Sequence, residues 1–153
     1  LAGQTGSTMV SGSEDRGQGQ DDIRHIIVRN IKGYCAGGHH IVRLLNTPGV
    51  RMHDIMLDGL IDTSPPDVRC RAAVKIGDSA YGGGVAPVGD TSRIIVNNVI
   101  SRSTHTVLIG GSLCDSIISN IIRYDVPGEA VTVQPGPEYM RNVTLSNIHI
   151  VED

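Results

Sequence analysis

The chain has 153 residues, a formal net charge of −3, and neither Phe nor Trp. This length suits one domain, and the acidic balance argues against nonspecific nucleic-acid binding. No apolar stretch reaches the ~18 residues that a spanning helix needs, so we expect neither a nucleic-acid partner nor a membrane span. The 19 Gly residues and the aliphatic core residues favour a narrow fold with many bends.

Five short stretches of the sequence resemble one another. Each has an apolar centre and ends in Asn or Gly, which is followed directly by Ile, Leu or Val. Their last residues are spaced 29, 39, 22 and 27 positions apart: Asn30, Gly59, Asn98, Asn120 and Asn147. Apolar triplets lie between them at residues 42–44, 74–76, 107–109 and 131–133. This spacing predicts a solenoid that returns to the same place about every 25 residues.

We therefore predict an all-β fold, a right-handed parallel β-helix of about four to five rungs over residues 23–153. In each triplet, the first and third side chains should point inward and the middle one outward. Asn tolerates the left-handed backbone of a bend that ends the first strand, and stacked Asn amides can hydrogen-bond along the coil. A β-sandwich also has short, frequent strands, but it does not predict like residues at aligned positions.

Residues 1–22 are rich in Gly and Ser, and residues 8–11 (TMVS) resemble the second set of strands. We expect this segment to form a partial first rung or a cap. Of the three Cys residues, Cys35 and Cys70 occupy the same loop of successive rungs, which leaves a bridge and two unpaired buried thiols as alternatives. A start at Leu1 fits a processed product, so we expect a secreted, periplasmic or cell-surface protein whose export signal was removed.

An apolar stripe is predicted on the outside of the coil. The outward positions of the first strand set are interrupted only by Thr144, and the others are Ile27, Met56, Ile95 and Ile117. Exposed apolar stripes usually mark contacts, and a short coil has unpaired strand edges at both ends. We expect a homo-oligomer formed through this stripe or the coil ends; the alternative is a loop that folds over the stripe.

One segment resembles a known family. Residues 104–112 (THTVLIGGS) are similar to the Gly-His-Gly-Leu-Ser-Ile-Gly-Ser strand of polygalacturonase-type glycoside hydrolases, which are pectin-lyase-like β-helices. The resemblance implies a polysaccharide substrate and carries that family's His over to His105. The family's Asn-Thr-Asp, Asp-Asp and Arg-Ile-Lys motifs have no counterpart here, so we do not expect its usual paired-carboxylate chemistry.

Polar residues precede the second-set strands at similar positions. Stacking of successive rungs would bring His105 and Glu129 within about one strand spacing, close enough for acid/base partnership. Cations could bind a uronate, and a Tyr could stack on a sugar. We predict His105, Glu129 and His40 as catalytic residues and Arg43, Lys75, Arg71 and Tyr81 as substrate-binding residues. The alternative is that these are ordinary solvated side chains.

Three classes of function remain open. We predict a carbohydrate-active enzyme, related to glycoside hydrolases or polysaccharide lyases, that acts on a polysaccharide, with acidic polysaccharides among the candidate substrates. The alternatives are a non-catalytic carbohydrate-binding module and a structural assembly unit, because fold alone does not determine function. The Asp residues form no spaced calcium loop, so we expect no metal and no cofactor.

Overall fold

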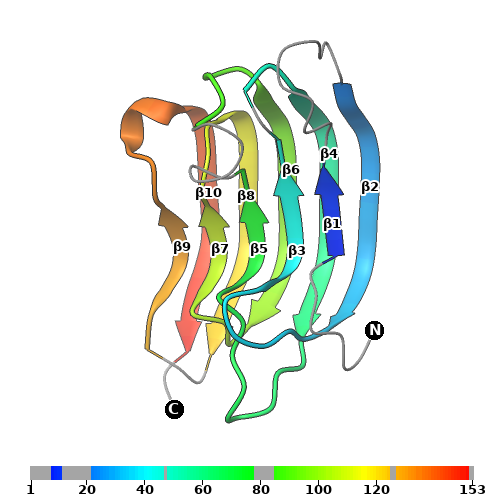
Figure 1. The fold of residues 1–153 in the computed structure, drawn as a ribbon. Coiled ribbons are helices and arrows are strands. Elements are labelled where there is room, and N and C mark those ends of the chain that lie inside the picture. Colours follow the sequence, from blue (N-terminus) through cyan, green and yellow to red (C-terminus); the bar gives the residue numbers. More distant parts are fainter. Residues whose placement is uncertain (1–7, 12–21, 47, 78–84, 125–126, 152–153) are drawn as a thin grey trace.

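The protein is all-β in the computed structural model, which describes residues 8–11, 22–46, 48–77, 85–124 and 127–151. Two five-stranded sheets lie one in front of the other (Figure 1). Every strand pair in both sheets is parallel. The chain alternates between the sheets, so each circuit adds one strand to each of them. This arrangement is compatible with a β-helix-like coil.

The two sheets differ in strand length. The short-strand sheet consists of β1 (Thr8–Ser11), β3 (His40–Leu45), β5 (Ala72–Ile76), β7 (His105–Ile109) and β9 (Glu129–Val133). The long-strand sheet consists of β2 (Asp22–Gly33), β4 (Arg51–Asp62), β6 (Thr91–Ser101), β8 (Leu113–Tyr124) and β10 (Met140–Val151). A single 3-10 turn, η1 (Pro137–Tyr139), precedes β10 among the described residues. Residues 8–11, which resemble the second set of strands, form β1 and pair in parallel with β3 at one edge of the short-strand sheet.

Register aligns the aliphatic residues of successive circuits, as the sequence predicts. Val42, Val74, Val107 and Val131 are direct partners in the short-strand sheet. The first three of these side chains are fully buried, as are Leu57, Val96 and Ile118 in the long-strand sheet. β-branched and other aliphatic side chains suit this interior because they pack well on a pleated surface. The core is therefore a stack of aliphatic rows between the two sheets.

Each long strand bends at two residues with positive φ, five positions apart. These pairs are His25 and Asn30, Asp54 and Gly59, Arg93 and Asn98, Asp115 and Asn120, and Asn142 and Asn147. The Asn and Gly positions therefore lie inside continuous strands, rather than at strand ends as the sequence suggested. The first residues of these pairs form a second column, the upstream column, which the spacing of Asn and Gly did not reveal: His25, Asp54, Arg93, Asp115 and Asn142. This column is equally left-handed, although residues such as Arg rarely adopt this conformation.

The predicted amide ladder along the coil is only partly formed. The Asn147 amide donates to Asn120 Oδ1 at 3.0 Å, as predicted. The Asn120 amide instead donates to Asn97 Oδ1 at 2.7 Å, and the Asn98 amide donates to Asp58 Oδ1 at 2.8 Å. In these two bonds the acceptor is the residue directly before the recurrent Asn or Gly of the adjacent circuit, Asn97 or Asp58.

The last circuit has a less covered interior than the others. Leu145 and Ile150 are register partners of the fully buried Ile118 and Arg123. They nevertheless stay 46% and 54% exposed, because β10 is the edge strand of its sheet among the described residues. Inward-facing apolar side chains are therefore accessible at this end of the coil.

Two glycines with matching backbones test how tightly the circuits pack. Gly77 has φ 68° and Gly37 has φ 67°. A Cβ at Gly77 would lie 2.8 Å from Gly111 Cα, whereas a Cβ at Gly37 would have no atom within 4 Å. We expect Gly37→Ala to lower the free energy of unfolding by about 1–2 kcal/mol through left-handed strain alone. Gly77→Ala should lower it by about 1–3 kcal/mol more through overpacking.

Urea unfolding followed by circular dichroism measures both free energies. Because the two substitutions share the same backbone strain, the difference between them isolates the contact between circuits. Equal losses for the two variants would contradict the close approach of Gly77 and Gly111.

Candidate functional site

A hydrogen-bonded trio forms on the short-strand sheet, at the last two circuits. His105 and Glu129 are direct register partners, and His105 Nδ1 lies 3.9 Å from Glu129 Oε2. The hydroxyl of Thr132 lies between them, 2.7 Å from His105 Nδ1 and 2.5 Å from Glu129 Oε2. The structure thus brings together two of the three predicted catalytic residues and adds Thr132.

The geometry of this trio selects one tautomer of His105. The Thr132 hydroxyl has a single proton, which it donates to the Glu129 carboxylate. Its oxygen must then accept a hydrogen bond from His105 Nδ1, so Nδ1 carries a proton. In the neutral imidazole, the unprotonated nitrogen is therefore Nε2. The trio therefore presents Nε2 as a proton acceptor.

The surroundings of His105 keep its imidazole neutral. Its side chain is 20% exposed, and this burial is the main reason why the pKa of His105 lies below its ordinary value of 6.5. The Glu129 carboxylate raises the pKa, whereas the positive charges of Arg71 and Arg123 lower it further. A neutral imidazole at neutral pH is competent to act as a base.

A buried arginine holds the backbone from which the trio projects. Arg123 is fully buried, and its Nη1 donates to the carbonyl oxygens of Thr104 at 3.0 Å and Glu129 at 3.4 Å. Its Nη2 donates to Pro127 O at 2.6 Å. These bonds fix the starts of β7 and β9, where His105 and Glu129 lie. Burial lowers the pKa of Arg123, but the carbonyl oxygens solvate its charge.

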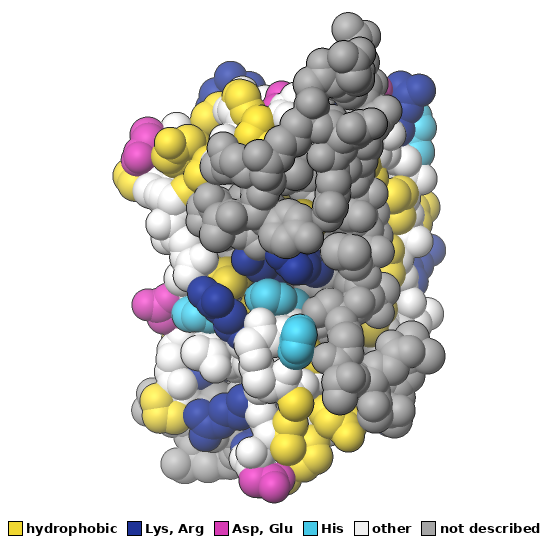
Figure 2. Space-filling view, in the orientation of Figure 1, with side chains coloured by type: hydrophobic (Ala, Val, Ile, Leu, Met, Phe, Trp, Pro, Cys, Tyr) yellow, Lys and Arg dark blue, Asp and Glu magenta, His cyan; other side chains and the backbone are white. Residues whose placement is uncertain are grey.

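The other predicted site residues differ in their access to solvent. Arg71 is exposed, and its carbonyl oxygen accepts from His105 N at 2.9 Å, but its neighbour Ala72 holds the register position between His40 and His105. His40 and Lys75 are only 5% and 6% exposed, and Arg43 is half-buried as the register partner of Lys75. Tyr81 lies outside the described residues. His and Lys or Arg side chains gather at the middle of this face (Figure 2).

The long-strand sheet carries a groove of about 440 Å³ on its outer face. Its floor includes the predicted apolar stripe, and register confirms that the stripe is continuous: Ile27, Met56, Ile95 and Ile117. Ile27 is 63% exposed. The groove lies on the sheet opposite to the trio, so the structure separates the apolar stripe from the predicted chemistry.

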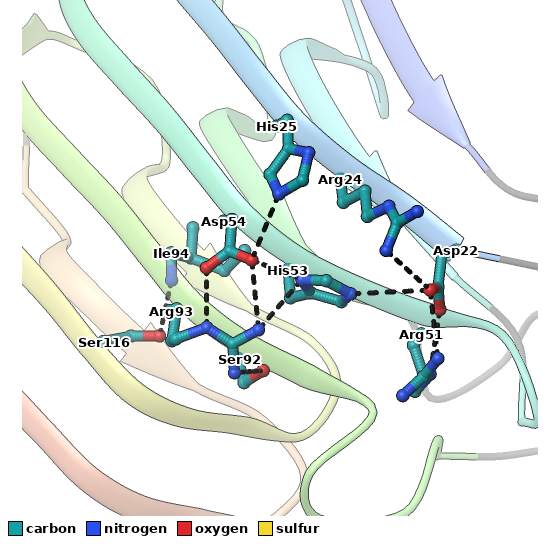
Figure 3. A network of polar contacts seen from close by, with 10 residues as sticks. All are labelled: Asp22, Arg24, His25, Arg51, His53, Asp54, Ser92, Arg93, Ile94 and Ser116. Atoms are coloured by element: carbon teal, nitrogen blue, oxygen red, sulfur yellow. Dashed lines mark hydrogen bonds and ion pairs between the residues drawn. The ribbon is translucent and has the colours of Figure 1, made fainter.

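Charged residues of the upstream left-handed column form one wall of this groove. Arg93 Nε donates to Asp54 Oδ1 at 2.6 Å, and His53 Nδ1 lies 2.6 Å from Asp54 Oδ2 (Figure 3). Arg93, followed by His53, holds the pKa of Asp54 well below its usual range. His25 lies 3.8 Å from the same carboxylate, and Asp115 lines the groove one circuit beyond Arg93. Along the wall, the imidazole of His25 is thus followed by the negative charge of Asp54, the positive charge of Arg93 and the negative charge of Asp115.

Sequence reasoning missed Thr132 and this charged wall. Thr132 follows Glu129 by three residues and belongs to the outward column of Arg43 and Lys75. The residues of the wall lie five positions before the recurrent Asn and Gly, so the spacing of the repeat could have found them: His25, Asp54, Arg93 and Asp115.

Comparisons of the chain with family models, with curated proteins and with solved structures found no match. Within the described ranges, no helix is long and apolar enough to cross a membrane. The same residues contain no cluster of three or more His, Cys, Asp or Glu that could hold a metal ion.

The electrostatic environment of His105 can be measured by titration. We expect a pKa below 6.5 for His105 in NMR spectra of the imidazole protons. Arg71→Gln should raise this pKa because a nearby positive charge is removed, whereas Glu129→Gln should lower it because a negative charge is removed. Shifts of both variants in the same direction, or a wild-type pKa above 6.5, would contradict the described surroundings.

Proposed function

We propose that this chain is a right-handed parallel β-helix of the pectin-lyase-like kind, and that it acts on an acidic polysaccharide. Alternation of the chain between two parallel sheets supports the coil. The likeness of residues 104–112 to a polygalacturonase strand supports the substrate class. Because such a polymer is a wall or matrix component, we place the protein outside the cytoplasm, as a secreted, periplasmic or cell-surface protein.

The observation that carries this proposal is the Thr132 bridge between His105 and Glu129. It fixes the imidazole so that Nε2 accepts a proton, and burial keeps that nitrogen unprotonated at neutral pH. Glu129 is 63% exposed, so water screens its charge, and its role is to orient the imidazole through Thr132. In this proposal His105 is the catalytic residue, and Thr132 and Glu129 are positioning residues.

Elimination needs what this site holds, which is one unprotonated base close to cations. Inverting and retaining glycosidases use two carboxyl groups, about 5 to 9.5 Å apart. Among the described residues, Glu129 is the one carboxylate within ion-pair distance of His105. A uronate offers a proton on the carbon beside its carboxyl group, and a neutral base next to cations can remove it.

The proposed step uses His105 and the exposed Arg71. Arg71 pairs with the carboxylate of the uronate, which makes the adjacent proton more acidic. His105 Nε2 takes that proton, the C–H electron pair becomes a carbon–carbon double bond, and the glycosidic C–O bond breaks. The departing oxygen takes a proton from water, and the imidazolium later returns its proton to solvent. Arg43, half-buried on the neighbouring column, extends the cationic surface.

His40 and Lys75 have a different place in this proposal. Their low exposure, 5% and 6%, leaves little surface for a polymer to contact. We assign them to the support of the site, with His40 two circuits before His105 in the same register column. The prediction that Tyr81 stacks on a sugar is kept, and it rests on the sequence alone.

The test is an assay of uronate-containing and neutral polysaccharides. We expect unsaturated products, read by their ultraviolet absorbance, only from the acidic polymers. His105→Ala should lower the rate by about 10²–10⁴-fold, and Thr132→Val should lower kcat less than this. His149→Ala, on an exposed strand of the other sheet, serves as the control and should retain full activity. The rate of the wild type should fall only below pH 6.5, as His105 becomes protonated.

Other outcomes of this assay would identify the alternatives. Reducing ends without ultraviolet absorbance would mean hydrolysis and would overturn the elimination step. Retention of an acidic polymer without any product would favour a carbohydrate-binding module. If the chain neither binds nor degrades any of these polymers, the result would favour the alternative of a structural unit.

We also propose that the groove of the long-strand sheet binds a second copy of the chain. The polar groups along its wall complement themselves when two copies face each other in opposite directions. The carboxylate of Asp54 then lies opposite the guanidinium of Arg93, and the imidazole of His25 lies opposite the carboxylate of Asp115. A two-fold interface requires a surface that matches itself in this way. The exposed Ile27 and Ile117 would become buried in it.

Sedimentation or light scattering tests this interface. We expect a dimer for the wild type and a monomer for Ile27→Lys, because the substitution places a charge at the most exposed point of the stripe. Val88→Lys, at an exposed apolar loop residue outside the groove, is the matched control and should remain dimeric. A monomer from Ile150→Lys but not from Ile27→Lys would assign self-association to the coil end instead.

A further inference from the structure

Two buried cysteines from successive circuits lie against each other. Cys35 follows β2, and Cys70 precedes β5, so that both belong to the connections between the two sheets. Both side chains have no exposed surface. Their loops are also joined by the backbone, because Arg71 N donates to His39 O at 3.0 Å and Thr63 N donates to Gly33 O at 2.9 Å.

The two sulfur atoms are closer than a van der Waals contact. Cys35 Sγ lies 2.7 Å from Cys70 Sγ. Nonbonded carbon atoms already prefer about 3.5–4.0 Å, and sulfur is larger than carbon. In addition, the Cys35 amide donates to Cys70 Sγ at 2.9 Å, and the Cys70 thiol lies 2.7 Å from Cys35 O. The backbone therefore holds the two side chains in one fixed arrangement.

We propose that Cys35 and Cys70 form a disulfide that links two neighbouring circuits of the coil. Cys114 is excluded from this pair, because it lies on β8 and contacts Arg141 instead. Buried free thiols are common in protein cores, but such thiols do not need sulfur atoms at this separation. The inference does not depend on the proposed function.

The chemistry of bond formation needs a small-molecule disulfide such as oxidised glutathione. The attacking group is a thiolate, and either cysteine can supply it while the chain is still unfolded; Cys70 is taken as the first to react. Cys70 attacks one glutathione sulfur and releases one reduced glutathione. Cys35 then loses its proton, attacks the Cys70 sulfur, and releases the second glutathione. Because both thiols are buried in the folded chain, this exchange takes place during folding.

Mass spectrometry after refolding tests the proposal. The 153-residue chain is unfolded and refolded in a glutathione redox buffer, and its thiols are then alkylated under denaturing conditions. Of its three Cys residues, we expect only Cys114 to be alkylated, and a peptide map should contain the Cys35–Cys70 linkage. Alkylation of all three thiols, or a linkage that includes Cys114, would overturn the proposal.

Thermal unfolding supplies a second readout with matched controls. Reduction with dithiothreitol should lower the melting temperature of the wild type by an amount on the order of 10 °C, because a closed loop in the unfolded chain is released. The Cys114→Ser variant should lose stability on reduction in the same way. Cys35→Ser and Cys70→Ser should melt at the same temperature with and without dithiothreitol. Equal sensitivity of all four proteins would contradict the link.

Because neither readout involves a polysaccharide, both can succeed while the activity assay fails. The bond and the proposed function are therefore tested separately.

Discussion

The whole structure depends on parallel register between successive circuits. Each inner strand of a sheet hydrogen-bonds to the strands of the preceding and the following circuit. A side chain therefore lies next to the equivalent position of its neighbours, as Val42 does with Val74 and Val74 with Val107. A shift of one residue in any circuit would turn its aliphatic row outward. The two left-handed residues of every long strand bend all five strands at the same places.

The same register places two charged side chains, Asp62 and Arg123, in the interior, where they bind groups close to His105. Asp62 and Arg123 belong to one inward column with Ser101 between them. Buried charges are unfavourable unless they are fully hydrogen-bonded. Asp62 Oδ2 accepts from the Ser101 hydroxyl at 2.8 Å and the Ser103 hydroxyl at 2.9 Å, while Arg123 binds backbone carbonyl groups. These contacts hold residues 103 and 104, which directly precede β7. The position of His105, the first residue of β7, therefore depends on a buried hydrogen-bond network.

The sequence predicted the all-β fold, the aligned strands and the pairing of His105 with Glu129, because each of these follows from the spacing of like residues. It did not predict Thr132, since the partner of a side chain three residues away along a strand depends on rotamers rather than on spacing. Arg71 lies one residue outside the column of His40, His105 and Glu129, which Ala72 occupies instead. The apolar triplets already indicate this, because Ala72 precedes its triplet by two residues, as His40 and His105 do. The burial of Lys75 was hidden for a different reason: a middle position of a triplet points outward, but other parts of the chain can still cover it.

The proposed catalytic site and the proposed dimer interface lie on different sheets, which has a consequence for the assembly. The trio of His105, Thr132 and Glu129 lies on the short-strand sheet, and the apolar groove lies on the long-strand sheet behind it. A second copy bound in the groove would therefore leave the surface around Arg71 open to a polymer. Two such copies, back to back, would present two separate sites facing away from each other. Because a polysaccharide repeats along its length, this arrangement would allow one assembly to hold two chains, or two segments of one chain, at the same time.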